Sequence, residues 1–140
     1  MKDLRLINIK DDGVIELTPW NLHEPIKGRE AAIQRVVIGL ITTPGTMMFA
    51  PSWGGGAYRL FLSNRTSKKQ VKHRVEAVIQ HTKQSVLSSE PAEDDYRVTL
   101  IEFGGISFNN DRGFSVDIEI GFANSTAADI SIPSGTFASP

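Results

Sequence analysis

The sequence lacks cysteine altogether, which excludes disulfide bonds and cysteine-ligated metal sites. It also has no apolar run that approaches the roughly 20 residues of a membrane-spanning helix. The N-terminal stretch MKDLRLINIKDDG carries no apolar segment of the kind found in a signal peptide, so we expect synthesis and folding in the cytoplasm. The net charge of -1 provides no overall attraction for nucleic acid or for an anionic membrane.

The remaining composition is typical of one soluble globular domain. The chain has 140 residues, of which 40% are hydrophobic and 22% charged, and this is enough apolar material for a core. We expect the domain to cover residues 1–122. Residues 123–140 consist mainly of Ser, Thr, Ala, Gly and Pro, which predicts a low-complexity tail or an arm that adds a strand to a neighbour's sheet.

The N-terminal region, residues 1–28, is predicted to be a hairpin followed by an irregular arm. Apolar residues alternate over residues 4–9, which is typical of a strand. The Asp-Asp-Gly turn signal at 11–13 separates this segment from a returning strand at 14–17. Two prolines between residues 18 and 25 then exclude a regular helix.

Three segments are predicted to be helical. Apolar side chains recur every three or four residues over 29–41 and 68–88, which predicts amphipathic helices with one buried face. A shorter apolar segment at 57–62 predicts a third helix. Strands are predicted at 96–103, 106–108 and 114–122, the last because apolar and polar residues alternate there without a break.

These elements predict an α+β fold, a single compact domain with about three helices packed on a small sheet that is mainly antiparallel or mixed. In the segment 96–103, apolar residues fall on both faces of the expected strand. That pattern predicts a central strand that is covered on both sides.

The connector at 41–56 is rich in turn-forming residues. Pro44 and Gly45 predict a tight turn, because proline presets φ and glycine accepts positive φ. The three glycines at 54–56 are not followed by the lysine and hydroxyl pair of a phosphate-binding loop, so we interpret them as freedom for a sharp turn.

Two short motifs in this connector carry a family resemblance. The stretches Thr42-Thr43-Pro44-Gly45 and Pro51-Ser52-Trp53-Gly54 resemble the T-x-x-G…P-x-x-G signature of the baseplate wedge, or sheath-initiator, family of contractile phage tails, which has relatives in type VI secretion. In that family a helix precedes the signature and a longer helix follows it, before an E-P-R motif and a closing pair of strands. The same order occurs here over residues 29–122. Glu90-Pro91 stands in place of the E-P-R motif, with Ala92 where the arginine is expected and Arg97 as its displaced match.

The resemblance implies a structural protein of the virion's tail baseplate, assembled in the host bacterial cytoplasm, that links the wedge core bundle to the tail sheath and initiates sheath assembly. Its implied partners are the tail sheath protein, the core-bundle proteins and other baseplate subunits in a sixfold assembly. It implies no catalytic residue, cofactor, metal, nucleic acid or membrane. The implied partner-binding residues belong to the signature, to the E-P motif and to the last strand of a sheath-like handshake sheet: Pro44, Gly45, Pro51, Trp53, Gly54, Glu90, Pro91, Arg97, Phe114, Val116, Ile118 and Ile120.

Two other functions have weaker sequence support. The outward face of residues 65–83 is basic and is typical of a binding module for nucleic acid or an acidic protein, although no aromatic residue on it would stack bases. Glu90 with Asp94 or Asp95 would be the carboxylate pair of a glycosidase, but these acids fall in a polar turn rather than a pocket. We therefore expect that the protein is not an enzyme.

Overall fold

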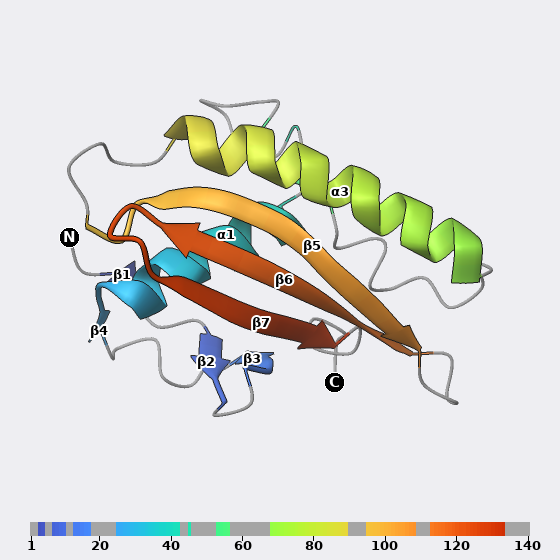
Figure 1. The fold of residues 1–140 in the computed structure, drawn as a ribbon, viewed down its shortest axis with the longest axis horizontal. Coiled ribbons are helices and arrows are strands. Elements are labelled where there is room, and N and C mark those ends of the chain that lie inside the picture. The colour runs from blue at the N-terminus through green and yellow to red at the C-terminus, as the bar shows by residue number, and fades with distance from the viewer. Residues whose placement is uncertain are drawn as a thin grey trace.

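The computed structural model describes residues 3–4, 7–10, 13–17, 25–42, 45, 53–56, 68–89, 95–108 and 113–133 (Figure 1). Two helices and seven strands occur in these ranges. The elements, in chain order, are β1 (Asp3–Leu4), β2 (Ile7–Ile9), β3 (Ile15–Leu17), β4 (Pro25–Ile26), α1 (Arg29–Ile41), α3 (Lys68–Ser89), β5 (Val98–Phe108), β6 (Phe114–Phe122) and β7 (Ala127–Pro133).

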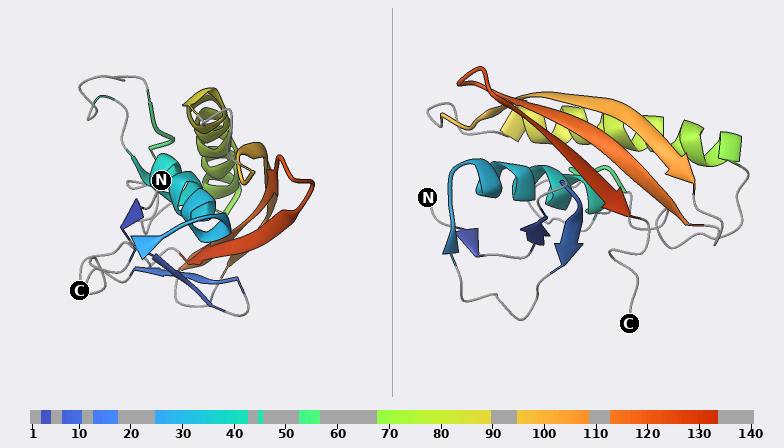
Figure 2. Two further views of the ribbon diagram at one scale, coloured as in Figure 1. Left: turned by 90° about the vertical axis from the view of Figure 1, so that its left-hand side faces the viewer. Right: turned by 60° about the horizontal axis from the view of Figure 1, so that its bottom comes forward.

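The largest element is an antiparallel sheet with the strand order β5-β6-β7. Both helices lie on the same side of this sheet, α1 behind β6 and β7 and α3 along the β5 side (Figures 1 and 2). The molecule therefore has a helical layer on a sheet, and the opposite face of the sheet is the outer face. The short strands pair separately, β1 with β4 and β2 with β3.

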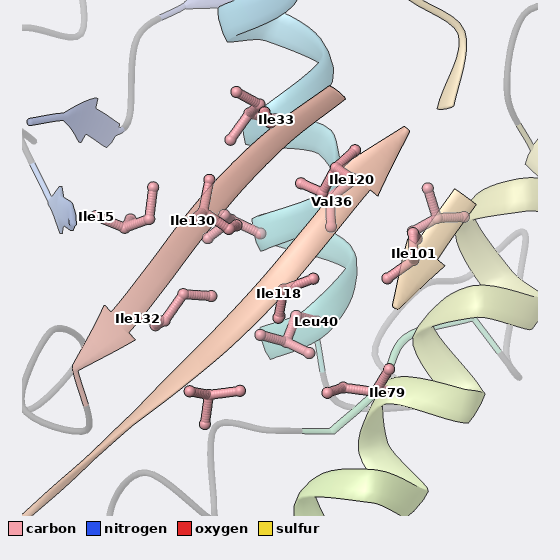
Figure 3. Close-up of a cluster of buried hydrophobic side chains, with 14 of the residues drawn as sticks. Ile15, Ile33, Val36, Leu40, Ile79, Ile101, Ile118, Ile120, Ile130 and Ile132 are labelled. Carbon is pink, nitrogen blue, oxygen red and sulfur yellow. The ribbon is translucent and has the colours of Figure 1, made fainter. Parts of the chain in front are cut away.

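The core lies between the sheet and α1. Residues 114, 116, 118, 120 and 122 of β6 are all buried, because successive side chains of a strand point to opposite faces. Figure 3 shows isoleucines of β6 and β7 directed toward apolar side chains of α1, with Ile79 of α3 and Ile101 of β5 closing the cluster on one side. Ile15 of β3 closes it on the other side.

Several predicted elements are confirmed. The helix predicted at 29–41 is α1, the one at 68–88 is α3 with one more residue, and the strand at 114–122 is β6. The N-terminal hairpin is also confirmed, since β2 and β3 pair antiparallel with Ile7 opposite Leu17.

The predicted fold class is wrong in its count of elements. In place of about three helices on one small sheet, the described ranges hold two helices and three separate antiparallel sheets, a small α+β fold. The N-terminal strands are only two or three residues long, and they pair with each other rather than extend the main sheet. The helix expected at 57–62 lies outside the described residues.

The segment predicted as a low-complexity tail or as an arm for a neighbour's sheet contains a core strand of its own chain. Residues 127–133 form β7, which pairs with β6 from Ala127 to Pro133 and buries Ala128, Ile130 and Ile132. The polar composition of the segment concealed a period-two pattern, whose polar members lie on the outer face. Residues 134–140 lie outside the described part of the chain.

The prediction that 96–103 is a central, doubly covered strand is also wrong. β5 is an outer strand of the sheet and runs on to Phe108, with irregular register between Val98 and Leu100 and between Phe103 and Gly105. Each bulge shifts the alternation by one residue. Val98 and Ile101 therefore both face the core, while Leu100 remains 36% exposed on the outer face.

Candidate functional site

The segment 53–56, which contains the last two residues of the family-like signature and the two glycines after them, is hydrogen-bonded to α1. The Gly55 amide donates to the Gly39 carbonyl over 2.8 Å, and the Gly56 amide donates to the Thr42 carbonyl over 2.9 Å. These are carbonyls near the C-terminal end of α1, where a helix has no internal donors left. The amides of this segment therefore hydrogen-bond the carbonyls at the end of α1, in place of water.

The same segment is also held by α3. The Trp53 indole Nε1 donates to the Ser85 carbonyl over 3.1 Å, and the Gly54 amide donates to the Ser85 hydroxyl over 3.0 Å. Gly54 has a φ of +122° and passes so close to the Thr42 carbonyl oxygen that an added Cβ would overlap it. Glycine is therefore required at this position of the signature by backbone geometry.

We expect Ser85→Ala to lower the free energy of unfolding by about 1–3 kcal/mol, because it leaves the buried Gly54 amide without its acceptor. Ser88→Ala on the same helix is the matched control, since the Ser88 hydroxyl is exposed and bonds only its own helix. It should cost less than about 0.5 kcal/mol. Urea unfolding followed by circular dichroism measures both variants, and equal effects would contradict the role given to Ser85.

The signature residues thus have an internal role where the structure describes them. Trp53 and Gly54 lie between the two helices, whereas Gly45 is exposed with a φ of +94° and no atom within 4 Å of an added Cβ. Pro44 and Pro51 lie outside the described residues. The resemblance implies that Trp53 and Gly54 bind a partner. Gly54 is buried and the Trp53 indole is half-buried, so little of either residue is accessible to a partner.

The four implied partner-binding residues of β6 are buried. Phe114, Val116, Ile118 and Ile120 are 3%, 1%, 1% and 0% exposed. Ile118 and Ile120 point toward α1 (Figure 3). Both edges of β6 are already paired, one with β5 and one with β7. These side chains form the core, so a partner would meet the sheet at another strand.

Of the E-P motif and its displaced arginine, Arg97 alone belongs to the described residues, and Glu90 and Pro91 lie outside them. Arg97 is half-buried just before β5, and its carbonyl accepts a hydrogen bond from the Ala123 amide over 2.9 Å. The backbone of Arg97 therefore ties the start of β5 to the turn after β6.

The two outer strands of the main sheet differ in how their edges are covered. Beside β7, the Ser131 amide donates to the Gly13 carbonyl over 2.9 Å, and Val14 forms a parallel bridge with Ser131. Beside β5, none of the described residues forms a further strand. Among the described residues, the outer edge of β5 is therefore a strand edge without a paired strand.

The surface of α3 is basic at its N-terminal half. Lys68, Lys69, Lys72 and Arg74 are exposed. Lys68, Lys69 and Lys72 lie within about 100° around the helix axis, and we call these three residues the basic patch. The patch borders a hollow of about 700 Å³, whose lining among the described residues is Lys69, Gln70, Lys72, His73, Arg74 and Glu76. The Lys68 ammonium also lies 5.5 Å from the centre of the Phe108 ring, a cation–π contact at the end of β5.

Over the described ranges, no three side chains of the metal-ligating types group closely enough to hold an ion. Neither α1 nor α3 is long and apolar enough to cross a membrane.

Comparison of the chain with protein-family models, with curated proteins and with solved structures finds no match. The resemblance to the baseplate wedge family therefore stays a prediction that rests on its motifs and their order.

One group of surface residues could not be anticipated from the sequence. Glu102, Glu119 and Asp129 are direct cross-strand partners on the outer face of the sheet, and we call them the acidic row. Their alignment depends on the bulges in β5 and on the existence of β7. In the sequence, the alternation of apolar and polar residues over 114–122 is the one pattern that predicts an outward position for Glu119.

Proposed function

We propose that this chain is a structural component of a contractile-tail baseplate, which links the wedge core bundle to the tail sheath and initiates sheath assembly. The order of motifs along residues 29–122 supports the family, as described above. The observation that carries the assembly role is the edge of β5, which has a strand neighbour on one side only among the described residues. In this proposal a strand of the first sheath ring adds to that edge.

Strand addition would use backbone groups rather than a catalytic site. An extended segment pairs with the free N–H and C=O groups of an edge strand, and alternate side chains of the added strand meet the two faces. On the outer face, the exposed Leu100 would give an incoming side chain an apolar contact. The helical layer behind the sheet would cover the other face (Figure 2).

The fold gives this edge a rigid base. Val98 and Ile101 anchor β5 in the core, and β6 pairs with it along its length. In the segment 53–56, the Gly55 amide bonds to α1 and the Gly54 amide bonds to Ser85 of α3. The segment therefore links the two helices that lie behind the edge. A preorganised edge reduces the entropy lost when the partner strand binds.

Site-specific crosslinking in assembled particles tests the proposal, and the absence of native cysteine makes it direct. Ser107→Cys places a thiol on the exposed outer face of β5, and Ala127→Cys places one on exposed β7. With a short photo-crosslinker attached, we expect Ser107→Cys to capture the sheath protein and Ala127→Cys to capture it much less. Capture at Ala127 in preference to Ser107 would contradict addition at β5.

A further inference from the structure

The acidic row is an unfavourable arrangement for an isolated molecule. Glu102 lies opposite Glu119, and Glu119 lies opposite Asp129, on the solvent-facing side of three adjacent strands. Like charges directly opposite each other in a sheet repel and destabilise it. Asp117, two residues along β6 on the same face, adds a fourth carboxylate nearby.

This charge is only partly compensated within the molecule. The Lys83 ammonium lies 3.4 Å from a Glu102 carboxylate oxygen, and this pair is exposed. No cation of the described ranges lies within 4.0 Å of the carboxylates of Glu119 or Asp129. The outer face of the sheet therefore presents net negative charge.

The basic patch is unfavourable for the opposite reason. Its cations occupy the first two turns of α3, and the first turn contains no acidic residue. The N-terminal end of a helix already carries partial positive charge from the aligned peptide dipoles, so cations there repel it. A negative partner on the basic patch would relieve this repulsion.

The lysines of the basic patch and the acidic row have comparable dimensions. Lys68 to Lys72 extends over four residue steps, which is about 6 Å along a helix axis. The acidic row crosses two strand spacings, which is about 9.6 Å. A helix end laid across the three strands would therefore oppose these lysines to the carboxylates.

The two surfaces are too far apart to neutralise each other within one molecule. Lys68 contacts Phe108 at the far end of β5, while the acidic row crosses β5 at Glu102. Six residues of strand separate them, which is about 20 Å. Only the other end of α3 reaches the acidic row, where Lys83 pairs with Glu102.

We propose that copies of this chain associate head to tail, with the basic patch of one copy on the acidic row of the next. Such a contact is heterologous, so it generates a ring if the rotation between neighbours closes and an open chain if it does not. The inference deepens the proposed function, on which it rests for its biological setting, because a sixfold baseplate brings copies of one subunit around a common axis.

The test is sedimentation velocity on the purified chain, with two reversal variants and two controls. Glu119→Lys reverses the acidic row, and Lys72→Glu reverses the basic patch. Asp95→Lys and Lys27→Glu are the matched controls, because they make the same charge changes at exposed positions outside both surfaces. All four positions are exposed, and circular dichroism checks that each variant is folded.

We expect wild type and both controls to form oligomers at about 25 mM salt and to dissociate at about 500 mM, because exposed ion pairs are screened. Each reversal variant alone should associate about tenfold or more weakly. An equal mixture of the two should associate more strongly than either variant alone. In that mixture, the intact acidic row of the Lys72→Glu chain accepts the intact basic patch of the Glu119→Lys chain.

Three results would overturn the inference. The chain could remain monomeric at low salt and high concentration, or associate equally well in all variants. It could also stay monomeric while binding a short DNA duplex through a surface that Lys72→Glu abolishes, which would make the patch a nucleic-acid site. These measurements use the isolated chain, so they are separate from the baseplate role. A monomer leaves that role standing, and absence from tail particles leaves the association standing.

Discussion

Gly55→Ala is expected to lower the free energy of unfolding by about 3 kcal/mol, since the new methyl group has no room between the two helices. An added Cβ would overlap the Thr82 hydroxyl oxygen and lie only 2.9 Å from the Leu40 carbonyl and 3.0 Å from the Val78 carbonyl. The two carbonyls belong to the backbones of α1 and α3, so they cannot rotate away. The helices would have to separate, and their shared core would loosen.

A double-mutant cycle separates the side-chain clash from the backbone clash. Thr82→Ala removes the hydroxyl, whose bond to the Val78 carbonyl stays within α3, together with a fully buried methyl group, and should cost about 1 kcal/mol alone. In the Gly55→Ala background it should recover part of the lost stability and leave the part due to the two carbonyls. Gly45→Ala is the control for strain, because Gly45 has positive φ and open space around it.

These variants are measured by chemical denaturation, with near-ultraviolet circular dichroism as a second probe of packing. If Gly55→Ala unfolds at the same denaturant concentration as Gly45→Ala, the segment 53–56 does not fill the space between the helices, and its role as a bridge is wrong.

Ile132→Ala is expected to cost about 3 kcal/mol, the usual range for removing a large buried aliphatic side chain. Ile132 is fully buried on β7 and lies opposite Val116 of β6. Its loss leaves a cavity between the sheet and the rest of the core. The chain should then unfold at a distinctly lower temperature and denaturant concentration.

Asp129→Ala is the matched control on the same strand. Asp129 is exposed on the outer face and opposes Glu119, so its removal should be neutral or slightly stabilising. If Ile132→Ala were as mild as Asp129→Ala, residues 127–133 would be a loose tail, and the three-stranded sheet would lose its third strand.

Local patterns were sufficient for the elements with a long, regular period. In α1, Val36, Val37 and Leu40 recur at helical spacing, and all three are buried. In β6 every second residue is apolar and every one of these is buried. Each pattern lies within a single helix or strand, so the element could be predicted without knowing which elements pack against it.

The errors arose where structure depends on distant partners. Ala128, Ile130 and Ile132 are too few to define a strand alone, and they are buried because β6 and the Gly13 turn lie beside them. The exposed position of Leu100 depends on a bulge that shifts the register of β5 against β6. Neither the pairing partner nor the bulge leaves a distinct local signal.

Features of the candidate site that lie within one element could likewise be predicted from the sequence. The basic face of the long helix follows from helical spacing alone, and four of its cations are exposed as expected. The glycines at 54–56 were correctly interpreted as a backbone requirement, but the reason is close packing against Thr42 and Thr82 as well as a turn. The acidic row needed the register of three strands, which only the fold supplies.

The most direct test of the proposed function is quantitative mass spectrometry of contractile tail particles purified from the source of this chain. The account predicts that the chain is present at about six copies per particle, as sixfold symmetry of the baseplate requires. If the particles lack the chain while it is abundant and free in the cell, the baseplate role is contradicted, and the basic patch of α3 becomes the first surface to examine for another partner.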